Sequence, residues 1–176
     1  IWTDNDTYFN PQFLALMRTR YLSAWPPKKN SDAFVASRGN AVRVAVHIRR
    51  GDVDISSVGH FKIGRYTSNT QVLAFMQLVE RDIRAKNNLQ DARFHIYSEG
   101  EPEAFADLVR AYGSARIFLH LGGDIKVSFH DMVSADVFIM AKSSFSYAAA
   151  LLSEGIIYYQ PFWCQALSTW RVLPKL

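Results

Sequence analysis

The chain has 176 residues and a mass of 20.0 kDa, and 49% of its residues are hydrophobic, enough for one domain with a substantial core. A single cysteine, Cys164, excludes a disulfide scaffold, and the Cys/His spacing of a zinc site is absent. The formal net charge of +4 suits an anionic ligand but is too small to indicate a nucleic-acid surface.

The first 40 residues are predicted to form a helix followed by a polar linker. Asn10 before Pro11 is typical of a helix start, and a Pro-Pro pair ends the pattern. Apolar residues recur at helical spacing between these points: Phe13, Leu14, Met17 and Tyr21. We therefore expect an N-terminal helical and linker segment at residues 1–40 and a second domain at residues 41–176.

Strand and helix patterns alternate from residue 41 onward. Five strands are predicted, at residues 41–48, 93–98, 116–121, 136–141 and 156–159. Helices are predicted between them, at 68–87 behind a Ser-x-x-Gln capping box, at 102–113, around 129–133 and at 145–153. One face of the first strand is apolar, and the fourth strand is apolar on both faces. Right-handed crossovers then predict the α/β class, as a Rossmann-like open parallel sheet with helices on both faces.

Ligands of such sheets bind beyond the carboxyl ends of the strands, where the first strand leads into His47-Ile48-Arg49-Arg50-Gly51-Asp52. Guanidinium groups bind phosphate in bidentate fashion, so an anion is the expected ligand. Gly51 permits a sharp turn, and Asp52 would fix the orientation of an arginine. The alternative is a solvated basic turn with a local Arg–Asp pair.

The fourth strand leads into Lys142-Ser143-Ser144-Phe145-Ser146, a polar turn that opens a helix. Free backbone N–H groups and the helix dipole at such a position bind phosphate, and two serines add hydroxyl donors. The alternative is an ordinary serine N-cap. Taken together, the turns after the first and fourth strands can hold one diphosphate from two sides. Neither a GxGxxG fingerprint nor a GxxxxGK[ST] loop is present.

Other candidate residues carry weaker signals. Glu99 follows the second strand and is a candidate base or ligand of a sugar hydroxyl, or a carboxylate that stabilises the next helix. His47 lies beside the arginines, and the other histidines are expected to be structural: His60, His95, His120 and His130. The C-terminal aromatic residues are expected to pack as a layer: Tyr158, Tyr159, Phe162, Trp163 and Trp170.

The run at residues 47–52 resembles the first motif of the GDP-fucose-dependent fucosyltransferases that form α-1,2 and α-1,6 linkages, with the protein O-fucosyltransferases as remoter relatives. Residues 131–151, which include the Ser-Ser-Phe-Ser turn, resemble their later motif. Residues 94–99 and 161–163 are similar to a strand end and a terminal Pro–Trp element of the α-1,2 group. The likeness covers roughly residues 42–163.

The resemblance implies the nucleotide-binding, C-terminal half of a two-domain GT-B glycosyltransferase. The implied reaction is inverting transfer of fucose from GDP-fucose to a hydroxyl of a glycan or glycoprotein, with no metal ion, cofactor or nucleic acid. The resemblance assigns roles to the following residues: the diphosphate to Arg49, the pocket shape to Arg50 and Asp52, a nucleotide contact to His47, and the β-phosphate cradle to Ser143, Ser144 and Phe145.

The resemblance also implies a location in the lumen of the Golgi or another secretory compartment. The longest apolar runs, such as residues 137–141, are far shorter than the roughly 20 residues of a membrane-spanning helix. Because the chain begins at Ile1, we expect a fragment or a processed form, so that a membrane anchor of the full-length protein would lie outside this sequence.

The sequence departs from the family pattern at several positions. Lys142 and Tyr147 stand where the α-1,2 group prefers Asn and Trp, and Ser128 stands where the α-1,6 group has the acid that contacts guanine. Asp124 or Asp131 would then take over guanine recognition, and Glu99 and Asp52 are the candidate general bases. The alternatives are a transferase that uses another sugar nucleotide and a noncatalytic domain that binds nucleotides, anions or glycans.

Overall fold

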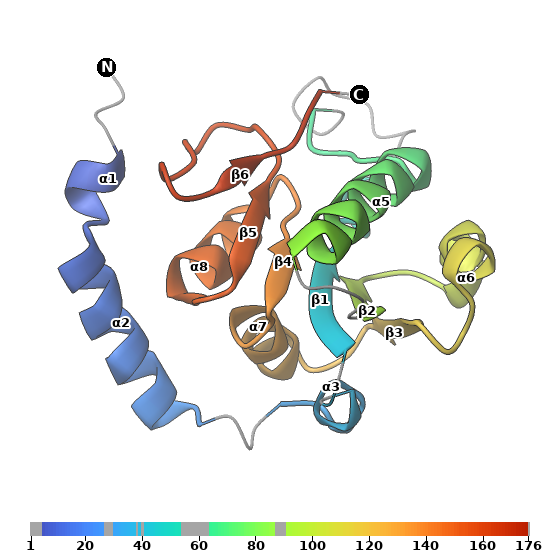
Figure 1. The fold of residues 1–176 in the computed structure, drawn as a ribbon, viewed down its shortest axis with the longest axis horizontal. Helices are drawn as coiled ribbons and strands as arrows, with labels where there is room; N and C mark the ends of the chain where they lie inside the picture. The colour runs from blue at the N-terminus through green and yellow to red at the C-terminus, as the bar shows by residue number, and fades with distance from the viewer. Residues whose placement is uncertain are drawn as a thin grey trace.

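The computed structural model describes residues 5–26, 30–37, 39, 41–53, 64–86 and 91–175. It confirms the α/β class, with one parallel sheet covered by helices on both faces (Figure 1). The strands are β1 (Ala41–His47), β2 (Asp91–Ser98), β3 (Ile117–Leu121), β4 (Val137–Ile139), β5 (Ile156–Tyr159) and β6 (Arg171–Val172). The helices are α1 (Asn5–Tyr8), α2 (Pro11–Ala24), α3 (Asp32–Ala36), α5 (Asn69–Lys86), the 3-10 turn η2 (Pro102–Phe105), α6 (Ala106–Tyr112), α7 (Ile125–Val133) and α8 (Ser144–Leu152).

The strand order β3-β2-β1-β4-β5-β6 is that of a Rossmann-like sheet. The chain winds outward from β1 to β3 and then returns to the centre, so that β4 pairs with β1 in parallel, with Val46 opposite Ile139. Because the connections leave β1 and β4 toward opposite sides, a crevice opens beyond the carboxyl ends of these two strands. The turns that follow β1 and β4 therefore lie at the topological switch point of the sheet.

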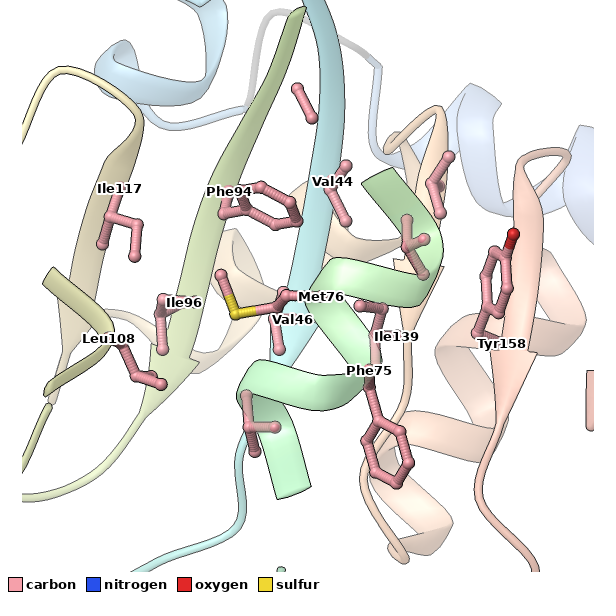
Figure 2. Packing of buried hydrophobic residues seen from close by; sticks show 14 of the residues in the cluster. Val44, Val46, Phe75, Met76, Phe94, Ile96, Leu108, Ile117, Ile139 and Tyr158 are labelled. Atoms are coloured by element: carbon pink, nitrogen blue, oxygen red, sulfur yellow. The ribbon is translucent and has the colours of Figure 1, made fainter. Parts of the chain in front are cut away.

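Helix α5 covers one face of the sheet. Its apolar side chains are buried against the sheet: Val72, Phe75, Met76, Val79 and Ile83. In Figure 2, Met76 projects from α5 onto the sheet near Val46 and Ile96. The predicted capping box is also confirmed, because Ser68 N–H donates to Gln71 Oε1 at 3.0 Å and Gln71 N–H donates to Ser68 Oγ at 3.2 Å. The predicted end of this helix at Asn87 lies outside the described residues.

Helices α7 and α8 pack on the opposite face. Successive β4 residues alternate between the two cores: Val137 and Ile139 belong to the cluster beneath α5, and Phe138 packs in the cluster beneath α7 and α8. All three are buried, as expected for a strand that is apolar on both faces. The turn after β4 is therefore held between two packed layers, which fixes the start of α8.

The N-terminal segment is joined to this second core. Helix α2 lies along the outer side of α8 (Figure 1), so only Leu14 of its predicted stripe is buried, and Phe13 and Met17 each remain 42% exposed. The Arg18 guanidinium donates to the carbonyls of Leu152 and Ser153 at the end of α8, at 3.1 and 2.7 Å. Within the predicted linker, the short helix α3 inserts Phe34, which is fully buried.

Strand β6 was not predicted from the sequence, because two residues are too few to show a strand period. Its Arg171 donates to Asp82 of α5 at 3.0 Å and lies over the Tyr158 ring, which ties the C-terminal segment to the sheet.

The C-terminal aromatic residues pack largely as expected, but Trp163 is 39% exposed. None of the described helices is both long enough and apolar enough to cross a lipid bilayer.

Candidate functional site

A cavity of about 860 Å³ opens at the carboxyl ends of β1, β2 and β3. Its walls come from the turn after β1, the ends of β2 and β3, one side of α7 and the start of α8: His47, Ile48, Arg49, Arg50, Gly51, Asp52, Tyr97, Ser98, Glu99, His120, Gly122, Gly123, Ile125, Ser128, Met132 and Phe145. A smaller cavity of about 320 Å³ lies at the amino ends of β1, β4 and β5. Because parallel sheets bind ligands at the carboxyl edge, the larger cavity is the candidate site.

Arg49 connects the turns after β1 and β4. Its NH1 group lies 3.4 Å from the hydroxyl oxygen of Ser143, and its NH2 group donates to both carboxylate oxygens of Asp52 at 2.8 Å. The Arg49 Nε is buried and has no hydrogen-bond partner among the described residues. Asp52 thus holds NH2, and NH1, beside the Ser143 hydroxyl, is the guanidinium nitrogen left to bind an anion.

The start of α8 has donors that its own side chains do not use. Ser143 occupies the N-cap position with extended backbone, but its side chain accepts no capping hydrogen bond. Ser143 is buried, whereas Ser144, the first residue of the helix, is exposed. The first N–H groups of a helix have no intrahelical partners, and they carry the positive end of its dipole. The arrangement therefore differs from the ordinary serine N-cap and leaves these donors beside Arg49.

His47 is held against the same helix. Its Nδ1 contacts the Ser146 hydroxyl, whose oxygen also accepts the Ala141 backbone N–H at 3.2 Å. The edge of the ring lies against Phe145, with centroids 5.6 Å apart. Burial, and secondarily the charge of Arg49, lower the pKa of His47 to about 4. The imidazole is therefore neutral at pH 7.

Arg50 uses its guanidinium away from the cavity, although the residue forms part of the wall. NH1 donates to the carbonyls of Arg49 and Thr67 at 3.0 Å, and NH2 donates to Asn69 Oδ1 at 2.8 Å. Burial lowers the pKa of this guanidinium, and the Tyr66 ring covers it at 4.6 Å. The structure therefore gives Arg50 a role in anchoring the start of α5, which shapes the pocket indirectly.

Gly51 lies against the carboxylate of Glu99. It has φ = +74°, and a Cβ atom added there would lie 1.8 Å from Glu99 Oε2. The Glu99 side chain is exposed, so it can move aside, but the backbone angle stays unfavourable for any other residue. The prediction that Gly51 permits a sharp turn is confirmed by this backbone angle.

We expect Gly51→Ala to lower the free energy of unfolding by about 1 kcal/mol because of its positive φ. Gly113→Ala is a matched control, since Gly113 has φ = +78° and open space around its Cβ position. Denaturant unfolding should show similar losses for both variants. Only Gly51→Ala should also weaken the binding of pyrophosphate, used as a probe of the candidate anion site and measured by calorimetry, because it displaces the Arg49 turn. Equal pyrophosphate affinity in both variants would contradict this role of the turn.

The structure does not bring Asp131 into the cavity wall. Asp131 is fully buried, and its two oxygens accept hydrogen bonds from Asn30 Nδ2, Ser31 N–H, Ser31 O–H and Tyr97 O–H at 2.6–3.0 Å. Asp124, the other acid considered for guanine recognition, caps α7 and accepts Lys126 N–H at 2.7 Å. The predicted nucleotide contact of Asp131 therefore finds no support in its position. Ser128, in contrast, lines the cavity.

Sequence reasoning missed two neighbours of the predicted residues. Arg65 lies in the long connection after β1, which carries no periodic signal. Its guanidinium lies over the Trp163 ring at 5.0 Å, and its pKa is lowered by burial and by the charge of Arg49. His120 was expected to be structural, yet it lines the cavity near the carboxyl end of β3. Its position one residue before the end of a predicted strand was the available signal.

Comparison with protein-family models, with curated proteins and with solved structures finds no match to this chain. Within the part of the chain that the structure describes, no three His, Cys, Asp or Glu side chains cluster as ligands of a metal ion. The sheet topology and the side chains at its carboxyl edge are therefore the observations that bear on function.

Proposed function

We propose that the chain is the nucleotide-binding domain of a glycosyltransferase of the fucosyltransferase type, which transfers fucose from GDP-fucose to a hydroxyl of a glycan or glycoprotein in the secretory pathway. The observation that carries this proposal is the contact between Arg49 NH1 and Ser143 Oγ at the switch point of the sheet. It joins the two motifs whose sequences resemble those of the GDP-fucose-dependent enzymes. The nucleotide class and the sugar rest on that resemblance.

The NH1 group of Arg49, which Asp52 does not engage, matches the needs of a departing diphosphate. When the bond between the sugar and the β-phosphate breaks, negative charge develops on the phosphate oxygens. Arg49 is held in place before the reaction by two 2.8 Å contacts to Asp52, so little reorganisation is needed at that moment. Removing one such donor typically costs about 2.7–4 kcal/mol of transition-state stabilisation.

The N-terminus of α8 supplies the second side of the phosphate site. The Ser143 hydroxyl lies beside Arg49, and the free N–H groups of the first turn follow it in the chain. The neutral His47 keeps its Nδ1 toward Ser146, so its Nε2 is the nitrogen left for a polar group of the ligand. Phe145 packs against the His47 ring and fixes its plane.

One observation favours a second candidate function, a noncatalytic domain that binds diphosphates or other anions. The carboxylates that line the cavity, among the described residues, are Asp52 and Glu99, and Asp52 is already paired with Arg49. Asp131 is also fully engaged, and neither Asp124 nor Asp131, the acids considered for guanine recognition, lines the cavity. Such a domain would hold the diphosphate without selecting the base.

A thermal-shift titration separates the candidates. We expect GDP and GDP-fucose to stabilise the protein, by about 2.7 kcal/mol at a ligand concentration 100 times the dissociation constant. UDP-sugars should stabilise it much less at the same concentrations. Equal shifts with GDP, UDP and pyrophosphate, without release of GDP from GDP-fucose, would favour the binding domain. Absence of any shift with GDP would refute both.

A further inference from the structure

We infer that His120 is the general base of the site and that its proton-accepting nitrogen is Nδ1. This inference rests on the proposed function, because it assigns the base for the same transfer reaction. His120 lines the cavity near the carboxyl end of β3, and its ring stacks on Tyr97 with centroids 4.6 Å apart and planes inclined by 12°. The register of the sheet places it there, since His120 pairs with Tyr97 across β2 and β3.

A buried chain of hydrogen bonds determines which nitrogen of His120 carries the proton. The Ser37 hydroxyl donates to the Phe34 carbonyl at 2.8 Å, so its oxygen is left to accept from His95 Nε2 at 2.9 Å. His95 is fully buried, and burial with the charge of nearby groups lowers its pKa to about 3, so it is neutral. A neutral imidazole that donates through Nε2 must accept through Nδ1.

Because His95 Nδ1 accepts a hydrogen bond, it determines the tautomer of His120. The two rings meet at 3.0 Å between His95 Nδ1 and His120 Nε2, so His120 donates from Nε2. A neutral His120 therefore has a bare Nδ1, which has no hydrogen-bond partner among the described residues. Burial lowers the pKa of His120, while Asp131 opposes that shift. His120 is thus unprotonated at neutral pH, the state that a base requires.

The reaction step is balanced as follows. The oxygen of the acceptor hydroxyl bonds to the anomeric carbon of fucose, and its proton passes to Nδ1 of His120. The bond between the anomeric carbon and the β-phosphate oxygen breaks, and its electron pair leaves with GDP, whose added negative charge lies toward Arg49. His120 becomes an imidazolium and GDP gains one negative charge, so that protons and charge are conserved. His95 and Ser37 are positioning residues, because they act through His120.

Several other titratable groups lie near this base. They are His95 and Tyr97 of β2, Asp131 of α7, and the groups that share the cavity: His47, Arg49, Asp52 and Glu99. The pKa of His47 at about 4 lies well below neutral pH, so His47 stays neutral at pH 7. Asp131 is present in the wild type and in the variants below, so its effect on His120 is common to them.

The test combines NMR of the uniformly ¹⁵N-labelled protein with kinetics of GDP release from GDP-fucose. Long-range ¹H–¹⁵N spectra should show His120 as the Nε2–H tautomer, titrating below pH 6.5. His120→Gln should lower kcat/KM by at least about a hundredfold, the usual contribution of a general base, and should abolish the acid limb of its pH profile. Imidazole added to the buffer should restore part of the activity of His120→Ala, which a purely structural role would not allow.

The outcomes separate the two proposals. A wild-type protein that does not bind GDP would overturn the proposed function together with the reaction step. GDP binding accompanied by an Nδ1–H tautomer of His120 would overturn the base assignment alone. The same holds if His120→Gln retains the wild-type rate and acid limb. A wild type that binds GDP but releases none from GDP-fucose would instead overturn the transferase proposal together with the base assignment.

Discussion

Replacement of Arg49 with alanine should weaken GDP binding roughly a hundredfold, because two charge-assisted hydrogen bonds worth about 1.5 kcal/mol each are lost. The two donors are the N–H groups of NH1, which lies 3.4 Å from Ser143 Oγ. Arg49→Lys should lie between the wild type and alanine, since lysine keeps the charge but loses the planar fork. Isothermal titration calorimetry with GDP measures both effects.

The matched control for this experiment is Arg84→Ala. Arg84 lies near the end of α5, its side chain is 62% exposed, and it pairs with Glu80 at 2.9 Å. Its loss changes the net charge of the protein by the same amount, so a general electrostatic effect would appear equally in both variants. If the two alanine variants bind GDP with the same affinity, the phosphate site is not at Arg49, and the proposed function loses its central observation.

The layout of the fold was predictable because its signals are local. A strand that is apolar on one face, a capping box such as Ser68 with Gln71, and a glycine after a helix each need only a few residues to be recognised. Once the strands and helices alternate, the handedness of crossovers leaves few topologies, and the switch point follows. This is why the sequence also indicated that the turns after β1 and β4 were the ones to inspect.

The direction of individual side chains was not predictable in the same way. Arg49 and Arg50 are adjacent and chemically identical, yet Arg49 pairs with Asp52 beside the cavity and Arg50 anchors Asn69 of α5. The segment at Thr67 and Asn69 that receives Arg50 is about twenty residues away in sequence, and no local pattern connects the two. Only the tertiary fold decides which of the two neighbouring arginine side chains lies beside the cavity.

Long-range pairs explain the remaining differences. His95 and His120 contact each other because of the register between β2 and β3, which the sequence alone does not specify. Asp131 is an acid beside a predicted phosphate site, so its residue type suggested a ligand contact. Its donors come from Asn30 and Ser31, which are about one hundred residues away in a segment that was expected to be a linker.

Asp131→Ala should therefore act on stability. Four donors would lose their acceptor inside the core, and leaving buried donors without partners costs about 1–3 kcal/mol each before water compensates. We expect a loss of roughly 3–5 kcal/mol in the free energy of unfolding, a large share of the 5–15 kcal/mol that is typical of a domain. Asp131→Asn should lose less, because it keeps one acceptor oxygen but turns an NH₂ group toward the remaining donors. Urea denaturation measures both.

Asp124→Ala is the matched control, since it removes an exposed carboxylate that caps α7 and should cost only about 1 kcal/mol. GDP affinity distinguishes a structural Asp131 from one that contacts guanine. Under conditions where Asp131→Asn remains folded, its GDP affinity should equal that of the wild type, because the carboxylate lies behind Tyr97 and outside the cavity wall. A tenfold loss of GDP affinity with unchanged unfolding free energy would instead show that Asp131 contacts guanine, as considered from the family resemblance.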